Sequence, residues 1–270
     1  MTTEFISMLE PPGSSISKYD QTKLSSEQDA QIPATFREAM SIREAVFVKE
    51  QGVPLENELD EDDPRAFHWV AYASVGQHGG SPAAGPPPAR DTLGHRKSSS
   101  ASSDDGRRKS ESTASRVAVG CIRLVPPPHN HGLAPPHSAL PNGGPSADGH
   151  LSSSEEPYVK IGRLATLPEF RRMGLSRLLI KAALDHAAAH PDAIVPALSP
   201  AELEKQRLEG KPGALPWRGL VFIHAQKQVQ GFWEKYGFKV DEGMGTWDEE
   251  GIEHIGMWRR IPIKKEKLGF

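Results

Sequence analysis

Three long segments poor in large apolar side chains interrupt this sequence. Residues 76–115 and 126–157 consist mainly of Gly, Pro, Ser and charged residues, and residues 191–216 are a milder case that we expect to be partly helical. Such segments bury too little apolar surface to offset the entropy lost on ordering. Because each lies between strand-like segments, we predict disordered loop insertions within one domain spanning residues 1–270, not linkers between domains. Roughly 150 to 170 residues then remain, which is the size of one ordinary domain.

Outside these insertions, the apolar pattern alternates between the helical period and the strand period. Helices are predicted over residues 35–52, from near Met173 onward, and over residues 228–238. Strands are predicted over residues 67–74, 115–125, 158–167 and 218–225, and a hairpin over residues 239–260. A strand, a helix and a second apolar strand in succession indicate a right-handed crossover between parallel neighbours. We therefore predict an α/β fold with a mixed sheet whose parallel pair sits near the middle.

Charge and cysteine content narrow the class of protein. Lys and Arg number 32 and Asp and Glu 35, so the net charge of -3 creates no positive field that would recruit nucleic acid or a membrane surface. One cysteine cannot form an internal disulfide, and the first residues lack a signal-peptide pattern. No apolar run approaches the roughly 20 residues of a membrane span. We expect a soluble chain in the cytoplasm or the nucleus, and the oligomeric state stays open.

The segment "VKIGRLATLPEFRRMGLSRLLIKAAL", residues 159–184, joins an apolar strand to an amphipathic helix. A helix N-terminus has unpaired N–H groups and the positive end of a dipole, so this junction predicts an anion cradle. Gly174 would let phosphate oxygens approach the backbone. The spacing is R-x-x-G-x-S, from Arg171 to Ser176, and matches neither a phosphate loop nor a GxGxxG dinucleotide loop.

The R-x-x-G-x-S spacing resembles the pyrophosphate motif Q/R-x-x-G-x-G/A of the GNAT superfamily of N-acetyltransferases, with Ser176 at the last position. Two further segments, "IREAVFVKEQGVPLENELDEDD" and "GFWEKYGF...EEGIEHIGM", resemble N- and C-terminal signatures of the ElaA-like branch. The resemblance implies a mostly antiparallel sheet with a splayed central parallel pair. It also implies acetyl-CoA as the co-substrate, a primary amine as the acceptor, and no metal. The residues it implies for cofactor binding are Leu164, Ala165, Thr166, Arg171, Arg172, Met173, Gly174, Leu175, Ser176 and Arg177.

Four residues are candidates for catalysis on the same resemblance. Glu50 is the candidate base, with a solvated carboxylate at a helix end as the alternative. Many relatives carry a Tyr that acts as the general acid at the position of Trp233, and an indole cannot donate a proton in this way. Tyr236, three residues later, is therefore the candidate acid, with a core aromatic as the alternative. Arg163 and His254 are candidates for the acceptor site, and each could instead have a structural role.

Other segments are interpreted as structural. The acidic run 56–63 reads as a solvated loop, although an acidic rim would also attract a cationic amine. Cys121 reads as a small buried apolar residue, and His129, His131 and His137 as members of a Pro-rich loop without metal-ligand partners. Two other functions stay open: a non-catalytic CoA-binding module, and an enzyme resembling acyl-homoserine-lactone synthases.

Overall fold

The computed structural model describes residues 5–75, 115–129, 156–195 and 216–263, together with residues 201, 205 and 208. The chain divides into two compact units, Met1–Tyr72 with Ala118–Phe270, and Ala73–Val117. Of the second unit, the described residues are only the ends of two strands. The sites discussed below lie in the first unit. Among the described residues, no helix combines the length and the apolar character that a membrane crossing requires.

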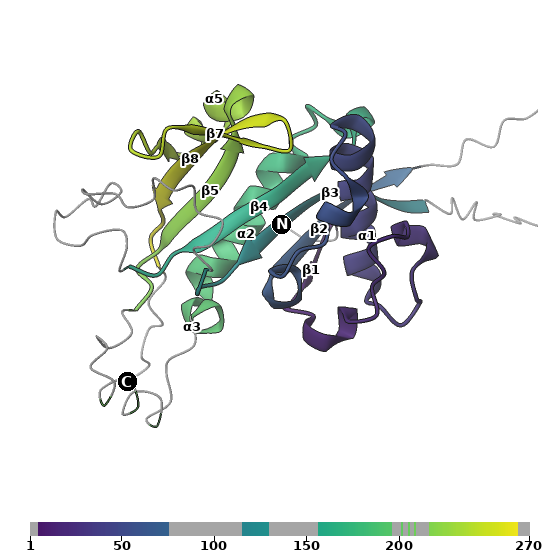
Figure 1. Cartoon of the computed structure of the whole chain (residues 1–270), viewed down its shortest axis with the longest axis horizontal. Helices are drawn as coiled ribbons and strands as arrows, with labels where there is room; N and C mark the ends of the chain where they lie inside the picture. The colour runs from purple at the N-terminus through teal and green to yellow at the C-terminus, as the bar shows by residue number, and fades with distance from the viewer. Residues whose placement is uncertain are drawn as a thin grey trace, which may run out of the picture. The chain divides into compact units, whose positions relative to one another are not determined.

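The first unit is built on a mixed sheet with the strand order β1-β2-β3-β4-β5-β8-β6, and β7 pairs with β8 (Figure 1). β4 and β5 pair in parallel, whereas β1 with β2, β3 with β4, and β8 with β5, β6 and β7 pair antiparallel. This confirms the predicted fold class. The strands are β1 (Ile6–Leu9), β2 (Phe67–Val75), β3 (Ser115–Val125), β4 (Val159–Thr166), β5 (Leu220–Gln226), β6 (Lys239–Val240), β7 (Thr246–Glu249) and β8 (Ile252–Arg260).

Helices cover both faces of this sheet. On β2, Trp69 and Ala71 belong to the core cluster that includes α2 (Leu175–Ala189), whereas Val70 and Tyr72 belong to the cluster that includes α1 (Ala34–Arg43). Side chains of a strand alternate between faces, so α1 and α2 lie on opposite sides of the sheet. The other α-helices of the described residues are the short α3 (Pro191–Ile194) and α5 (Gln230–Glu234).

Two N-terminal features differ from the sequence-based expectation. The predicted helix over residues 35–52 ends its α-helical part at Arg43 and continues as a π-helical turn, η3 (Glu44–Glu50), in which the amide of Gln51 donates to the carbonyl of Val46 (3.1 Å). Such turns are common at functional sites. β1 was not predicted, because its four residues are too few to show a period.

The structure also corrects the edges of the predicted insertions, whose central parts lie outside the described residues. Glu156 is buried and its carboxylate accepts hydrogen bonds from Arg260 (2.6 and 2.8 Å). His129 stacks on Tyr158 with 4.3 Å between ring centroids. Ile194, in α3, is also buried. Packed side chains therefore continue a few residues into two of the segments, 126–157 and 191–216, that composition alone marks as unable to pack.

The acidic run 56–63 is not the solvated loop that its composition suggests. Asp63 is fully buried and accepts hydrogen bonds from Arg43 Nη1 and Arg123 Nη1 (2.8 Å each) and from the amide of Asp60 (3.0 Å). Glu58, 3% exposed, accepts from Arg43 Nε (2.9 Å). Burial acts to raise the pKa of Asp63, but the guanidinium groups of Arg43 and Arg123 hold it well below its usual range. The composition was misleading because these carboxylates are paired with arginines on other elements.

We expect Asp63→Asn to lower the free energy of unfolding by about 3 kcal/mol, because it leaves two buried guanidinium groups short of an anion. Urea denaturation followed by circular dichroism measures this change. Glu242→Gln, at an exposed loop carboxylate, is the control and should change stability by less than about 0.5 kcal/mol. Equal effects of the two substitutions would contradict the role assigned to Asp63.

Candidate active site

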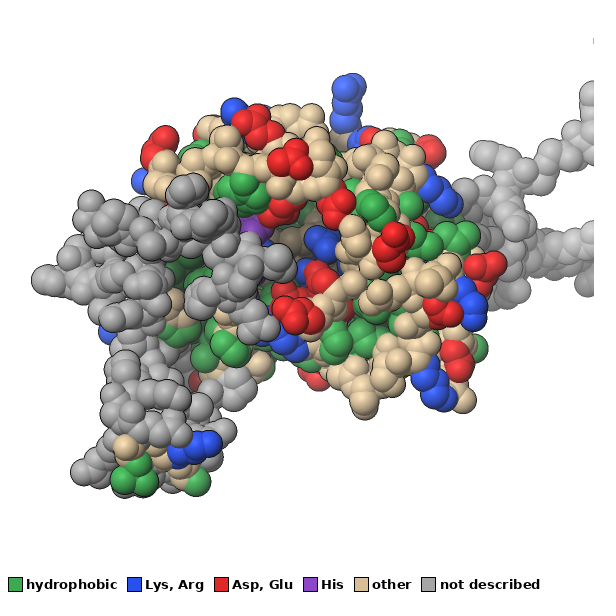
Figure 2. Space-filling model, viewed as in Figure 1, with side chains coloured by type: hydrophobic (Ala, Val, Ile, Leu, Met, Phe, Trp, Pro, Cys, Tyr) green, Lys and Arg blue, Asp and Glu red, His purple; other side chains and the backbone are tan. Residues whose placement is uncertain are grey.

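β4 and β5 part shortly after they pair. Their parallel pairing covers only Val159 with Val221, Lys160 with Phe222 and Ile161 with Ile223. Beyond these pairs the strands line a cleft of about 1040 Å³, whose other walls come from η3, the loop after it, and the β7–β8 hairpin. Figure 2 shows the hollow with acidic, basic and histidine side chains around it. Residues 162–166 of β4 thus have no strand partner on their β5 side, so the backbone groups on that side that no side chain occupies can bind a ligand.

A β-bulge reshapes β4 within the cleft. Cys121 pairs with Ala165 but Arg123 pairs with Gly162, so β4 carries one residue more than β3 between these pairs. Arg163 takes a left-handed conformation, with φ of 52°. The thiol of Cys121 donates to the carbonyl of Arg163 (3.4 Å), which satisfies a backbone group that the bulge displaces.

The predicted anion cradle lies where β4 passes into α2. Arg172 and Gly174 have φ of 65° and 81°, and a Cβ at Gly174 would meet no atom within 4 Å. α2 begins at Leu175, two residues later than expected, because these positive φ values hold the chain out of the helix. The amide of Leu178 donates to the carbonyl of Gly174 (3.2 Å), so the amides before it form the free first turn. Arg171, Arg172, Met173, Gly174 and Arg177 are exposed.

Side chains tie this cradle to the end of β4. The hydroxyl groups of Thr166 and Ser176 are hydrogen-bonded (3.2 Å), and Nε of Arg171 donates to the carbonyl of Thr166 (3.1 Å). Thr166, Arg171 and Ser176 also line the cleft, as do Leu164 and Ala165. The structure therefore brings the predicted cofactor-binding residues together along one path from β4 to the start of α2.

Glu50 lies at the end of η3 and does not line the cleft. Its Oε1 accepts a hydrogen bond from Arg171 Nη1 (2.8 Å), and its Oε2 pairs with Arg171 Nη2. The hydrogen bond from Arg171 lowers the pKa of Glu50. A carboxylate in this state accepts a proton poorly, so the geometry offers no support for the predicted role of Glu50 as the base.

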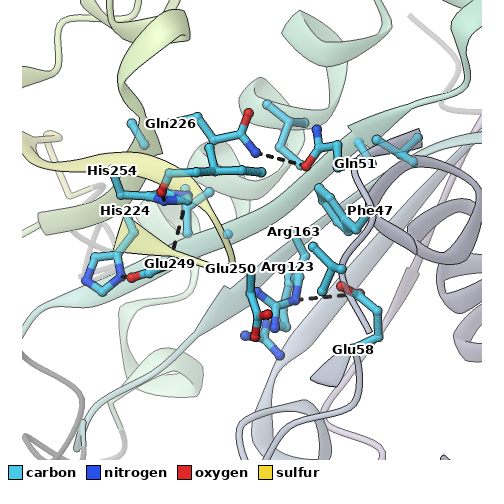
Figure 3. Close-up of a pocket in the computed structure, with 18 of the residues that line it drawn as sticks. Phe47, Gln51, Glu58, Arg123, Arg163, His224, Gln226, Glu249, Glu250 and His254 are labelled. Atoms are coloured by element: carbon cyan, nitrogen blue, oxygen red, sulfur yellow. Dashed lines mark hydrogen bonds and ion pairs between the residues drawn. The ribbon is translucent and has the colours of Figure 1, made fainter. Parts of the chain in front are cut away.

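A His–Glu–His group lies on the opposite wall of the cleft (Figure 3). Glu249 accepts hydrogen bonds from Nδ1 of His224 (2.8 Å) and from the indole N–H of Trp247 (2.7 Å), and it lies 3.9 Å from Nε2 of His254. Burial acts to raise the pKa of Glu249, but the hydrogen bonds from His224 and Trp247 keep it at about 2. Nδ1 of His254 lies 2.8 Å from the carbonyl of Ile252. A carbonyl only accepts, so Nδ1 carries the proton in the neutral ring and Nε2 keeps its lone pair.

The other two catalytic candidates differ in their positions. Arg163 lines the cleft, and its Nη2 donates to Asp60 (3.1 Å). Tyr236 does not line the cleft and packs against Phe232, with 5.0 Å between ring centroids, and against the hydrophobic core. Trp233 lines the cleft instead. The structure brings His254 and Arg163 to one cavity and leaves Tyr236 outside it.

Two hydrogen bonds join the walls of the cleft. Nε2 of Gln226, at the end of β5, donates to Oε1 of Gln51 (3.0 Å), as Figure 3 shows. Nδ2 of Asn57 donates to Oε1 of Glu250, in the β7–β8 turn (2.7 Å). Each bond connects the segment that follows η3 to the C-terminal part of the sheet.

The sequence analysis missed two cleft residues, Lys160 and Glu249. Lys160 is one polar position in an alternating strand, and Glu249 is one of several carboxylates in an acidic turn, so neither stands out by its pattern. Among the described residues, no group of three or more His, Cys, Asp or Glu side chains is arranged to hold a metal ion. His131 and His137 lie outside the described residues.

Comparison with known proteins gives one family match. The model of the Acetyltransferase (GNAT) family matches residues 105–198. No curated protein matches this sequence.

Several solved structures are similar to this chain at low identity. An acyl-CoA N-acyltransferase from Pseudomonas aeruginosa is 19% identical, with 88% of this chain and 95% of that chain covered and a TM-score of 0.40. ElaA of Escherichia coli is 16% identical, with coverage of 94% and 98% and a TM-score of 0.41. The acyl-homoserine lactone synthase BjaI is 15% identical, with coverage of 94% and 82% and a TM-score of 0.44.

We expect Cys121 to be unreactive in the folded protein. Its side chain is buried, and burial raises the pKa of its thiol to about 12, so little thiolate is present at neutral pH. Iodoacetamide should label the folded protein much more slowly than the urea-unfolded protein, as measured by mass spectrometry. Fast labelling of the folded protein would contradict this expectation.

Proposed function

We propose that this chain, which carries an N-acyltransferase domain of the GNAT family, moves an acetyl group from acetyl-CoA to a primary amine of a small molecule or peptide. One observation carries the proposal: the cleft where β4 parts from β5 opens directly onto the exposed first turn of α2. Free strand backbone next to free helix amides suits an elongated ligand that ends in a pyrophosphate. When bound, acetyl-CoA supplies the acetyl group as a thioester.

The chain's own backbone would do most of the binding. The amides from Arg172 to Arg177 face solvent at a positive helix end, which suits the pyrophosphate. Residues 162–166 have free backbone groups for the arm of the ligand. An N–H group among Leu164, Ala165 and Thr166 would polarise the carbonyl of the thioester, as an oxyanion donor does.

We propose that His254, and not Glu50, is the base that takes the proton from the amine. Nε2 of His254 has a free lone pair, lines the cleft, and lies near the carboxylate of Glu249, which would stabilise the imidazolium that forms. Glu50 is already bound to Arg171. A departing thiolate needs no acid of its own near neutral pH, so the position of Tyr236 outside the cleft does not prevent the reaction.

The first experiment is a calorimetric titration of the whole chain with acetyl-CoA, followed by amines with thiol release as the readout. We expect binding and amine-dependent thiol release. Binding without release for any amine would favour the non-catalytic CoA-binding module. Release that requires S-adenosylmethionine would favour a lactone synthase. Absence of binding would contradict the proposed site.

Substitutions at Gly174 make this titration specific to the cradle. Gly174→Asp would place a carboxylate beside the pyrophosphate and should weaken acetyl-CoA binding more than about tenfold relative to Gly174→Asn. Asn is the matched control, because it has the same shape and tolerates a positive φ equally well. Equal affinities of the two variants would remove the cradle from the proposal.

The choice of base is tested by comparing His254→Gln with Glu50→Gln. We expect His254→Gln to lower kcat about a hundredfold at neutral pH, because no group is left to take the proton, and Glu50→Gln to leave kcat nearly unchanged. Steady-state thiol release at saturating acetyl-CoA measures both values. A large loss in Glu50→Gln alone would reverse the assignment.

A further inference from the structure

Lys160 is a cationic side chain of the cleft without a partner. It lies where β4 and β5 begin to part, is paired in register with Phe222, and lines the cavity. Among the described residues, its ammonium group makes no hydrogen bond or ion pair, although burial lowers its pKa and Glu249 acts to raise it. An ammonium group in such a place is unfavourable unless an anion joins it.

Arg163 is a second cation of the same cleft with unused hydrogen-bonding capacity. Its Nε is buried, makes no hydrogen bond within the described part of the chain, and lies 3.9 Å from Glu58. Nη2 donates to Asp60, and a guanidinium group has five N–H donors. The backbone of Arg163 has φ of 52°, a conformation that non-glycine residues rarely keep outside functional sites.

Among the described residues, no neighbouring carboxylate makes a hydrogen bond or ion pair with Lys160. Glu58, Asp60 and Asp63 are ion-paired with Arg43, Arg123 and Arg163, so this cluster has three anions and three cations. Glu249 is engaged by His224 and Trp247. Glu249 acts on the charge of Lys160 only through space, so the N–H donors of the Lys160 ammonium group are available to a ligand.

The proposed site of the pyrophosphate lies too far from Lys160 for the pyrophosphate to bind it. Lys160 and Thr166 are six residues apart on β4, and a strand rises about 3.3 Å per residue, so they are separated by roughly 20 Å. The cradle begins beyond Thr166. A hydrogen-bonding partner for Lys160 therefore has to come from another molecule in the cleft, and the acceptor is the one that the proposed reaction provides.

We infer that the acceptor amine carries a carboxylate, as an amino acid does, and that Lys160 and Arg163 bind this carboxylate. This inference rests on the proposed function. The amine of such an acceptor would lie on the side of His254 and Glu249, which line the same cavity. Lys160 and Arg163 are then residues that determine specificity and take no proton from the amine.

The test compares matched acceptors with the whole chain, acetyl-CoA and thiol release as the readout. Each amino acid is paired with its amide and with its decarboxylated amine, for example phenylalanine with phenylalaninamide and phenethylamine. The amine of an amide is less basic and thus more often neutral, so a preference for the free acid cannot come from amine reactivity. We expect kcat/KM to be roughly tenfold or more higher for the free acids.

A variant then assigns the preference to Lys160. Lys160→Met should lower kcat/KM for free acids roughly tenfold, mainly through KM, and change kcat/KM for decarboxylated amines little. Lys181→Met, at an exposed lysine of α2 paired with Asp185, is the control and should keep the preference.

The outcomes separate this inference from the proposed function. Thiol release without a preference for free acids, or a preference that survives in Lys160→Met, overturns the inference and leaves the acetyltransferase in place. Binding of acetyl-CoA with no release for any amine or amino acid overturns the proposed function and, with it, the inference.

Discussion

The carboxylate of Asp63 joins three separate parts of the structure. It accepts hydrogen bonds from α1 through Arg43, from β3 through Arg123, and from the amide of Asp60 in its own loop. Fully buried carboxylates are stable only with such partners. The loop that carries Glu58 and Asp60 is thereby fixed against the sheet, and it forms one wall of the cleft. Asp60 in turn binds Arg163, so the same group of charges extends from the core to the side chain proposed to meet the acceptor.

The parting of β4 and β5 supplies the other requirement of the site, which is free backbone in a protein interior. Strand backbone is normally satisfied by a neighbouring strand, and here the bulge at Arg163 and the loss of pairing after Ile161 leave several groups for a ligand. The hydrogen bond from the Cys121 thiol to Arg163 shows how the chain keeps the displaced carbonyl satisfied.

The sequence was sufficient for the features that depend on local pattern. The apolar alternation of β3 predicted its ends at Ser115 and Val125, and the R-x-x-G-x-S segment was predicted to lie at the start of a helix, as it does at α2. Asp63 was misread because its partners Arg43 and Arg123 lie 20 and 60 residues away, where no local pattern can indicate them. The positive φ of Arg163 could not be predicted from the sequence either, because arginine is not a residue typical of that conformation.

The proposed catalytic side chains were harder to predict than the proposed path of the cofactor, and the reason is geometric. Backbone amides at a strand–helix junction are placed by secondary structure alone, whereas a base or an acid depends on where one side chain points. The side chain of Glu50 is bound to Arg171, and that of Tyr236 packs against the core. His254 is a candidate base because its ring lies near the carboxylate of Glu249, on the adjacent strand β7.

The hydrogen bonds of Gln51 with Gln226 and of Asn57 with Glu250 join residues 175 and 193 positions apart in the chain. Loop closure over such distances carries an entropic penalty that local contacts avoid. During synthesis, the N-terminal wall of the cleft can make these two contacts only after the C-terminal hairpin has been made. The first half of the chain can build α1 and the first strands, but it cannot assemble a binding site until β7 and β8 have been made and have paired.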